Sequence, residues 1–439
     1  MLLIYLPSAS SRTEYIFDTI FNHEYGLSFR VTSDVNYFLN YQEEKINYSN
    51  KRFQNELYIH ASYLLAENCI EPKSISIGKK NNTIILFPND ESCDIGFDVF
   101  AAAFYMLSRY EEYLPFSPDK YGRYNALDSV AYKNNFLQIP IVDYWLIIFK
   151  EILQNKFFSL AFKETKFKSI VTYDIDVAYK FKGRSFKRNA GATVKDVLHL
   201  DFKNILHRYK TLFHENKDPW DTYDYLKKII TQNNLSSLFF FLLADNSIND
   251  RNLHYKNPEM IELITKIKTF SEIGIHPSFK SSALLEKIGE EKKRLEDISG
   301  EIITRSRQHF LKFTLPETYN ALIDAGIEED YSMGFPYEPG FRAGTSKPFY
   351  FYDLKYEKLT GLKIFPITFM EGSFINSKLS HEKIVRVIAG LIKEVKNVEG
   401  TLISIWHNHT VSDTKEFKNL KYIHEWMIEA IVETNNFSK

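Results

Sequence analysis

Two aspartates follow a short apolar run near the middle of the sequence. Asp174 and Asp176 lie in the segment VTYDID, at the end of a run over 168–173 that is predicted to be a strand. Side chains at positions i and i+2 of a strand point to the same face, so both carboxylates can reach one cavity. One can bind a metal ion while the other accepts a proton from an attacking water molecule. The alternative is that the pair caps a turn and binds nothing.

Histidine and arginine side chains follow other apolar runs. His276 lies in EIGIHPSF and His407 in LISIWHNHT, and Arg307 and His309 follow a further run. An imidazole in such a position can be a metal ligand or a general acid, although a lone histidine is as often an ordinary core residue. A guanidinium can orient a carboxylate or bind substrate oxygens, or it can form a plain ion pair.

The elements that must position these residues alternate regularly from about residue 166. Short apolar runs predict seven strands, over 168–173, 237–243, 272–276, 302–307, 329–333, 361–366 and 401–406. Amphipathic segments between them predict helices near 223–232, 258–270, 282–297, 316–325, 381–395 and 418–433. Such alternation indicates βαβ units and a parallel sheet. Seven units predict a distorted (β/α)7 barrel, in which chemistry collects at the C-terminal ends of the strands.

The first part of the chain has a different pattern. Residues 1–162 predict a smaller α+β domain, with helices over 97–113 and 143–154 and no catalytic constellation. Residues 163–439 form the predicted catalytic domain. An insertion at about 179–219 is rich in Lys and Arg. This insertion is either an arm that attracts an anionic glycan, nucleotide or lipid phosphate, or a solvated helical excursion.

Composition narrows the possible classes. The 439 residues carry a formal net charge of −1, so no overall charge indicates a nucleic-acid partner. Two cysteines do not make a disulfide framework. No apolar run approaches the roughly 18 residues of a membrane span, and the first residues lack the basic region of a signal peptide. We therefore expect a cytoplasmic protein.

The ordered series VTYDID, GIHPS, SRQHF, GFRAGT and SIWHNH resembles the successive motifs of the NodB-homology polysaccharide deacetylases (carbohydrate esterase family 4). It is more closely similar to a bacterial subgroup with a separate N-terminal domain. The resemblance covers about 166–433. It implies that Asp174 is the catalytic base, that Arg307 orients it, and that His407 is the general acid. It also implies that Asp176 and His276 are metal ligands.

The sequence departs from the family pattern at two places. The family's second metal-binding histidine is replaced by Lys280, and the Pro-Tyr pair that follows the motif arginine is replaced by His309-Phe310. We take His309 as the third ligand, with His409 as the alternative. The ligand types predict a divalent metal, zinc in particular. Arg342 and His409 are predicted to bind substrate.

The function predicted from these features is metal-dependent removal of acetyl groups, as amide or ester, from an N-acetylated sugar or polysaccharide precursor. Two alternatives stay open. One is an inactive carbohydrate-binding relative that has lost its metal, which the lysine at position 280 favours. The other is a hydrolase of a non-sugar linear amide, which would use the same site with a different pocket.

Overall fold

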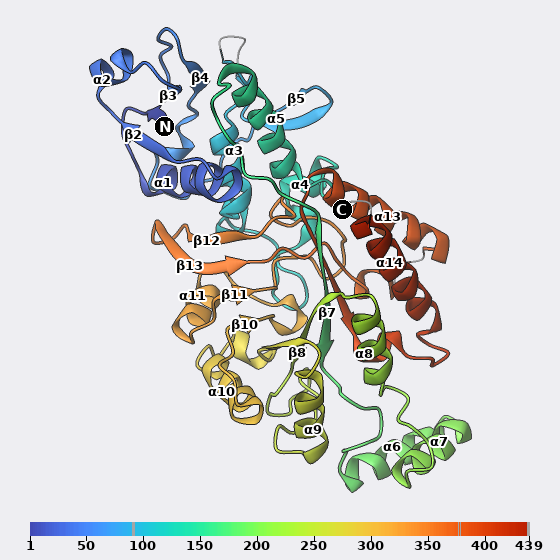
Figure 1. The fold of residues 1–439 in the computed structure, drawn as a ribbon. Helices are drawn as coiled ribbons and strands as arrows, with labels where there is room; N and C mark the ends of the chain where they lie inside the picture. Colours follow the sequence, from blue (N-terminus) through green and yellow to red (C-terminus); the bar gives the residue numbers. More distant parts are fainter. Residues whose placement is uncertain (90–92, 376, 378, 437–439) are drawn as a thin grey trace.

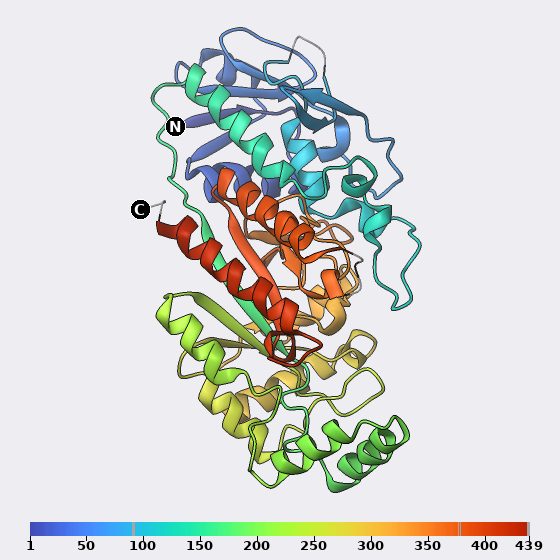
Figure 2. The same cartoon turned by 90° about the vertical axis from the view of Figure 1, so that its right-hand side faces the viewer.

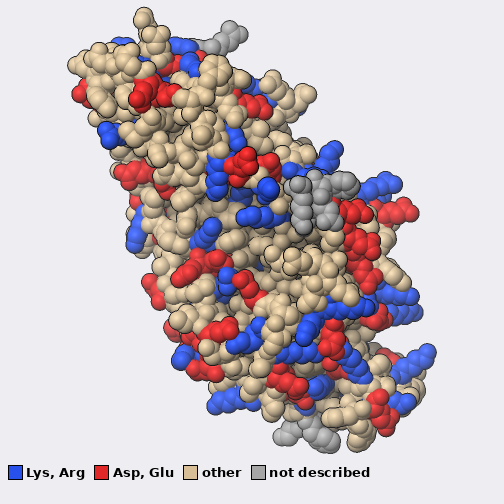
Figure 3. Space-filling view, viewed as in Figure 1, with Lys and Arg blue, Asp and Glu red and all other residues tan. Residues whose placement is uncertain are grey.

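The computed structural model describes residues 1–89, 93–375, 377 and 379–436. The molecule is elongated, with the N-terminal sheet at one end and helices α6 (Phe186–Leu198) and α7 (Phe202–Leu212) at the other, as the two views in Figures 1 and 2 agree. On the face shown in Figure 3, side chains of both charge signs are interspersed. In the described part of the chain, no helix is long and apolar enough to cross a membrane.

The N-terminal part contains a four-stranded parallel sheet with the order β2-β1-β3-β4. Its strands are β1 (Leu2–Tyr5), β2 (Phe29–Thr32), β3 (Lys45–Ser49) and β4 (Leu57–His60), and β5 (Ile77–Lys80) and β6 (Thr83–Leu86) form a separate antiparallel hairpin. The helices are α1 (Ser11–Phe17), α2 (Val35–Asn40), α3 (Val99–Leu107), α4 (Val130–Lys133) and α5 (Ile141–Lys156). The predicted helices over 97–113 and 143–154 correspond to α3 and α5. The four parallel strands were not predicted, because no regular alternation with amphipathic helices accompanies them in the sequence.

The second sheet has nine strands in the order β12-β13-β11-β10-β9-β8-β7-β15-β14, all parallel except β12. They are β7 (Lys168–Ile175), β8 (Ser236–Phe241), β9 (Glu272–Ile275), β10 (Arg305–Ser306), β11 (Glu329–Asp330), β12 (Phe349–Asp353), β13 (Lys358–Ile364), β14 (Phe369–Met370) and β15 (Thr401–His407). The central strands are apolar because helices cover their outer face.

Helices alternate with these strands as predicted. After α6 and α7 they are α8 (Tyr223–Gln232), α9 (Pro258–Ile267), α10 (Lys287–Ser299), α11 (Glu317–Asp324), α12 (Gly372–Ile375), α13 (His381–Asn397) and α14 (Lys418–Asn436). In α13, Ser380 caps the N-terminus, and Ile384, Ile388 and Leu391 are buried at helical spacing. An apolar stripe of this kind is what packs a helix onto a sheet.

The segment between β13 and β14 links two distant strands of the large sheet. Phe365 and Ile367 donate backbone hydrogen bonds of 2.8 and 2.9 Å to carbonyl groups in and after β11. Thr368 donates one of 2.8 Å to Ile403 of β15. One continuous segment therefore contacts both β11 and β15, which brings the two sides of the parallel strand series together.

The GFRAGT segment, residues 340–345, packs against the N-terminal part of the chain. Phe341 donates a backbone hydrogen bond of 2.8 Å to Leu137, and Val142 donates one of 2.8 Å to Gly344. A Cβ at Gly340 would lie 2.4 Å from the Leu137 carbonyl oxygen, so this close approach requires glycine. The segment therefore joins the two parts of the chain.

A buried ion pair network lies at the same junction. Glu112 of the N-terminal part accepts hydrogen bonds of 2.8 and 2.6 Å from Arg342, and a further one of 2.8 Å from Arg109. All three side chains are buried. Removing the Glu112 carboxylate would leave the buried Arg342 guanidinium without this partner, while Arg109 would keep only its ion pair with Glu111.

We expect Glu112→Gln to lower the free energy of unfolding by about 3–5 kcal/mol, because it breaks this buried network from one side. Urea denaturation would measure the change. Asp297→Asn is the matched control, since Asp297 pairs with Lys293 at 2.7 Å on the surface, and it should change stability by no more than about 0.5 kcal/mol. Equal effects of the two substitutions would contradict the prediction.

Candidate metal centre and catalytic site

Strand register brings the predicted site residues to one end of the large sheet. In the parallel pairing of β7 with β15, Asp174 lies directly opposite His407. The backbone N–H groups of His276 and Arg307, which follow β9 and β10, continue the ladder by bonding to the preceding strands at 2.9 and 3.0 Å. Because the strands are parallel, residues at their C-terminal ends meet at one rim.

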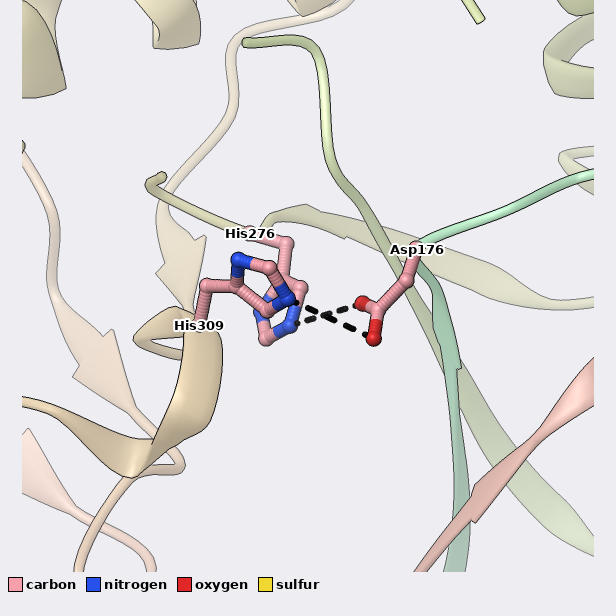
Figure 4. A group of neighbouring side chains, drawn as sticks. All are labelled: Asp176, His276 and His309. Carbon is pink, nitrogen blue, oxygen red and sulfur yellow. Dashed lines mark ion pairs between the residues drawn. The ribbon is translucent and has the colours of Figure 1, made fainter. Parts of the chain in front are cut away.

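Asp176, His276 and His309 form a compact cluster at this rim (Figure 4). Their ligand atoms all lie within 4.8 Å of one another. His276 Nε2 lies 3.2 Å from Asp176 Oδ1, and His309 Nε2 lies 3.4 Å from Asp176 Oδ2. Both imidazole rings are buried. The cluster therefore presents two imidazole nitrogens and one carboxylate to a single point.

Hydrogen bonds behind the two histidines orient them. His276 Nδ1 lies 2.5 Å from the carbonyl oxygen of Arg307, and His309 Nδ1 lies 2.9 Å from the carboxylate of Asp250. When the ring is neutral, Nδ1–H donates to this acceptor and the Nε2 lone pair is directed at the cluster. This is the arrangement that prepares an imidazole to bind a metal ion.

The electrostatics of the cluster favour positive charge at its centre. Burial would raise the pKa of Asp176, but His309 and His407 hold it well below its ordinary value. Burial also opposes protonation of His309, yet Asp176 and Asp250 raise its pKa to about 9. At both groups the attraction between carboxylate and imidazole therefore outweighs desolvation.

Asp174 is held beside the cluster by Arg307. Arg307 Nη1 donates a hydrogen bond of 2.8 Å to Asp174 Oδ1 and one of 2.6 Å to Thr172 Oγ1. The guanidinium is fully buried and stacks on Phe240, 4.4 Å from the ring centroid. The second oxygen of Asp174 lies 3.8 Å from His276 Nε2. Arg307 thus orients a buried carboxylate whose free oxygen faces the cluster.

His407 has a comparable partner in Glu371. His407 Nδ1 lies 2.5 Å from Glu371 Oε1, and its Nε2 lies 3.3 Å from Asp176 Oδ2. Although burial opposes it, Glu371 and Asp176 hold the pKa of His407 well above its ordinary value. Glu371 also accepts hydrogen bonds from the backbone N–H of His407 and the hydroxyl of Thr410. A protonated imidazole with its partner fixed in this way can deliver a proton at Nε2.

The donor set fits a divalent metal ion. Two imidazoles and one carboxylate are a known catalytic ligand set for zinc, with a further position open to water or substrate. Asp176 Oδ1 is buried and accepts no well-aligned hydrogen bond from the described residues, which leaves a lone pair for an ion. Both imidazoles have the outer hydrogen bonds that metal-binding histidines require.

Three other residues singled out in the sequence lie differently. The structure does not support substrate binding by Arg342, because its guanidinium is buried in the ion pair network with Glu112. His409 stays at the rim, where its ring lies 5.0 Å from that of Trp220, but it does not join the ligand cluster. Burial and the neighbouring His407 lower the pKa of His409 to about 3, so it is neutral. Lys280 is exposed.

Sequence reasoning missed two site residues, Glu371 and Asp250. Glu371 follows β14, a two-residue strand that the predicted strand over 361–366 did not include. Asp250 lies in the loop after β8 and is fully buried. An acidic residue shortly after an apolar run was the available signal, and it was applied only to Asp174 and Asp176.

Aromatic side chains from both parts of the chain lie beside His309. Phe310 follows it in the left-handed backbone region (φ 61°), an uncommon conformation that functional sites tend to contain. Its ring lies 5.1 Å from Tyr121 and 5.3 Å from Phe279, and all three are half-buried. Arg123 donates a hydrogen bond of 2.6 Å to the Phe310 carbonyl. The loop that contains Tyr121 and Arg123 therefore extends the N-terminal part to the rim.

Comparisons with known proteins give one family match in the N-terminal part and structural matches at low sequence identity. Residues 2–158 match a family of unknown function (DUF7033). No curated protein matches the chain. Among solved structures, the chain is similar to a candidate polysaccharide deacetylase from Mycobacterium smegmatis, with 13% identity and a TM-score of 0.40, over 61% of this chain and 85% of that one.

Two further structures show the same kind of similarity. One is a mutant of a CE4 family pseudoenzyme with restored activity, at 10% identity and a TM-score of 0.30, over 60% of this chain and 64% of that one. The other is a polysaccharide deacetylase from Bacillus cereus, at 10% identity and a TM-score of 0.29, over 62% and 88%. The structural neighbours are thus CE4 deacetylases matched over part of the chain.

Proposed function

We propose that this chain is a metal-dependent hydrolase that removes acetyl groups from an N-acetylated saccharide or polysaccharide precursor. The proposal rests on the arrangement of a possible metal site, a carboxylate and an imidazole at one rim of the sheet. The ligand cluster of Asp176, His276 and His309 lies between the oriented carboxylate Asp174 and the imidazole of His407. A base, an acid and a metal site within direct contact are what amide hydrolysis requires.

Each residue of the site has a defined task in this proposal. A divalent ion, zinc by donor type, would polarise the acyl oxygen and make water more acidic when bound. Asp174 accepts the proton of the attacking water, and Arg307 keeps the carboxylate in position. As the carbon–nitrogen bond breaks, His407 donates a proton from Nε2 to the departing amine. The products are acetate and a free amino sugar.

The proposed architecture follows from the strand pairing. We infer that the parallel strands close into a distorted (β/α)7 barrel, supported by the segment that contacts both β11 and β15. We also infer an accessory domain over 1–162 and a catalytic domain over 163–439. The family match over residues 2–158 supports this division. The loop with Tyr121 and Arg123 gives the accessory domain a contact with the catalytic rim.

The aromatic rim supports a saccharide substrate. Tyr121, Phe279 and Phe310 are partly exposed beside the ligand His309, and flat aromatic faces pack well against the C–H face of a sugar ring. An inactive relative is the less favoured alternative, because His309 completes a ligand set even though Lys280 replaces the family's histidine. A hydrolase of a non-sugar amide would use the same residues, so only a comparison of substrates distinguishes it from a saccharide deacetylase.

Acetate release tests the proposal. The purified chain, supplied with zinc, should release acetate from oligosaccharides of N-acetylated amino sugars and not from acetylated lysine peptides. Glu371→Gln should lower the turnover number by about 10–100-fold, because it loosens the general acid without removing it. Glu394→Gln, which alters an outer carboxylate bonded to Tyr144, is the matched control and should have no effect.

Each other outcome favours a different function. Release from the lysine peptide alone would support the hydrolase of a non-sugar amide. Bound metal without release from either substrate would support the inactive relative and contradict the proposal.

A further inference from the structure

Helices α6 and α7 form a hairpin that extends away from the rest of the molecule. It lies between β7 and α8, and Figures 1 and 2 both place it at the end opposite the N-terminal sheet. Ser185 caps α6 and Asp201 caps α7 with side-chain hydrogen bonds to the backbone. The basic insertion predicted from the sequence is therefore a defined pair of helices.

The two helices contact each other through polar groups. Arg208 is buried between them, where it forms an ion pair with Asp196 and donates a hydrogen bond of 3.2 Å to the carbonyl of Asn189. Asn204 donates a further hydrogen bond of 2.8 Å to Asp196. If the two helices were held together in water by packing on each other, we would expect apolar side chains at their contact, because burial of apolar surface is the main driving force for such packing.

Many large apolar side chains of the hairpin face solvent instead, although Ile205 and Leu212 are half-buried. We name Val194, Leu198, Phe202, Leu206 and Phe213 the apolar stripe; they are 61%, 77%, 63%, 59% and 73% exposed. Val194 and Leu198 are four residues apart on α6, as are Phe202 and Leu206 on α7, so each pair lies on one helix face. Single exposed apolar residues are ordinary, but a repeated exposed face marks an interaction site.

Unpaired basic side chains accompany the apolar stripe. Lys195, Lys203 and Lys210 are exposed, and no carboxylate of the described residues pairs with any of them. Residues 188–213 contain five Lys or Arg and two Asp or Glu, a net charge of +3. One of the two acids, Asp196, is already neutralised by Arg208. The accessible charge around the apolar stripe is therefore positive.

We propose that the α6–α7 hairpin docks on the surface of an anionic lipid bilayer. The apolar stripe enters the boundary between headgroups and acyl chains, and the three lysines contact anionic headgroups. Amphipathic helices with lysine-bordered apolar faces bind membranes in this way, through apolar burial together with attraction to anionic lipid. A protein partner would match the apolar stripe, but the unpaired positive charge favours the anionic surface.

The base of the hairpin is attached to the catalytic rim. Asp218 accepts backbone hydrogen bonds of 2.9, 2.8 and 3.0 Å from Lys180, Phe181 and Lys182, which ties the two ends of the insertion together. Trp220, two residues further, contacts His409 at the rim. Docking therefore brings the rim near the lipid surface. If the proposed function holds, on which this step alone depends, the substrate is a saccharide presented at a membrane.

Vesicle sedimentation tests the docking without any assay of activity. The full chain should bind vesicles of phosphatidylcholine with phosphatidylglycerol, and bind vesicles of phosphatidylcholine alone more weakly. Leu198→Glu with Phe202→Glu should weaken binding about tenfold or more, and so should Lys195→Glu with Lys203→Glu. Phe158→Glu with Ile302→Glu is the matched control, because these apolar residues are 91% and 82% exposed outside the hairpin.

Several results would overturn the proposal. Wild-type protein that stays in the supernatant with anionic vesicles rules out docking, whether or not the chain is a hydrolase. Equal loss of binding in the control variant would show that the hairpin has no special role. If the wild-type protein self-associates without binding vesicles, and the hairpin variants do not self-associate, the apolar stripe is an interface between copies of the chain.

Thermal unfolding is the control for each variant, since an unchanged unfolding temperature shows that the fold is intact.

Discussion

His309→Ala should yield a protein that no longer retains a divalent metal ion and has no measurable hydrolase activity. His309 supplies one of three ligand atoms within 4.8 Å of one another. Loss of an outer hydrogen-bond partner alone weakens metal binding by about 10–100-fold, so loss of a direct ligand should weaken it by more than about 100-fold. Elemental analysis of the purified protein, after equilibration with zinc and removal of free ion, measures the result.

Two substitutions make this test specific. Lys280→Ala is the matched control, because Lys280 has the position of the family's second histidine but its side chain is exposed; it should retain the metal. Asp250→Asn should give an intermediate affinity, since Asp250 orients His309 from behind. If Lys280→Ala or His409→Ala lost the metal while His309→Ala kept it, the ligand set proposed above would be wrong.

Asp174→Asn should abolish most of the hydrolysis while leaving the metal in place. The amide keeps the shape and the contact with Arg307 but cannot accept a proton, and general base catalysis contributes about 10²–10⁴-fold to the rate. The turnover number should fall by that factor. Metal content should equal that of the wild type, because Asp174 is not one of the three ligands.

The combination of the two measurements separates the roles of the neighbouring aspartates. Asp176→Asn should lose both metal and activity, whereas Asp174→Asn loses activity alone. Asp245→Asn is the surface control, since the exposed carboxylate of Asp245 pairs with Arg294 and Lys287 away from the three proposed ligands, and it should change neither. Full activity in Asp174→Asn would show that another group is the base, and loss of metal would make Asp174 a ligand.

Much of the secondary structure after residue 166 could be predicted from local pattern. All seven predicted strands and all six predicted helices overlap elements of the structure, because apolar periodicity reflects burial on one or both faces. The rule that chemistry lies at the C-terminal ends of parallel strands then selected Asp174, Asp176, His276, His309 and His407, which the structure brings together at one rim. The antiparallel strand β12 was missed, although its FYFYD sequence is rich in the aromatic residues that strands favour.

Pairings between distant residues could not be predicted in the same way. Arg342 and Glu112 are 230 residues apart, and only packing of the GFRAGT segment against the N-terminal part makes them partners. Nothing in the local sequence of an arginine distinguishes a buried ion pair from a substrate contact. The same holds for Asp250 with His309 and for Glu371 with His407, whose partners lie on separate loops.

The sequence by itself determined which residues can do chemistry and at which strand ends they lie, because strand periodicity and parallel connection are local properties of the chain. Only the tertiary structure decided that His309 and not Lys280 lies beside Asp176 and His276, and that the basic insertion carries exposed apolar side chains. Both depend on side-chain directions that are set when loops and helices pack. The local sequence does not fix these side-chain directions, because each side chain is held by contacts with residues from elsewhere in the chain.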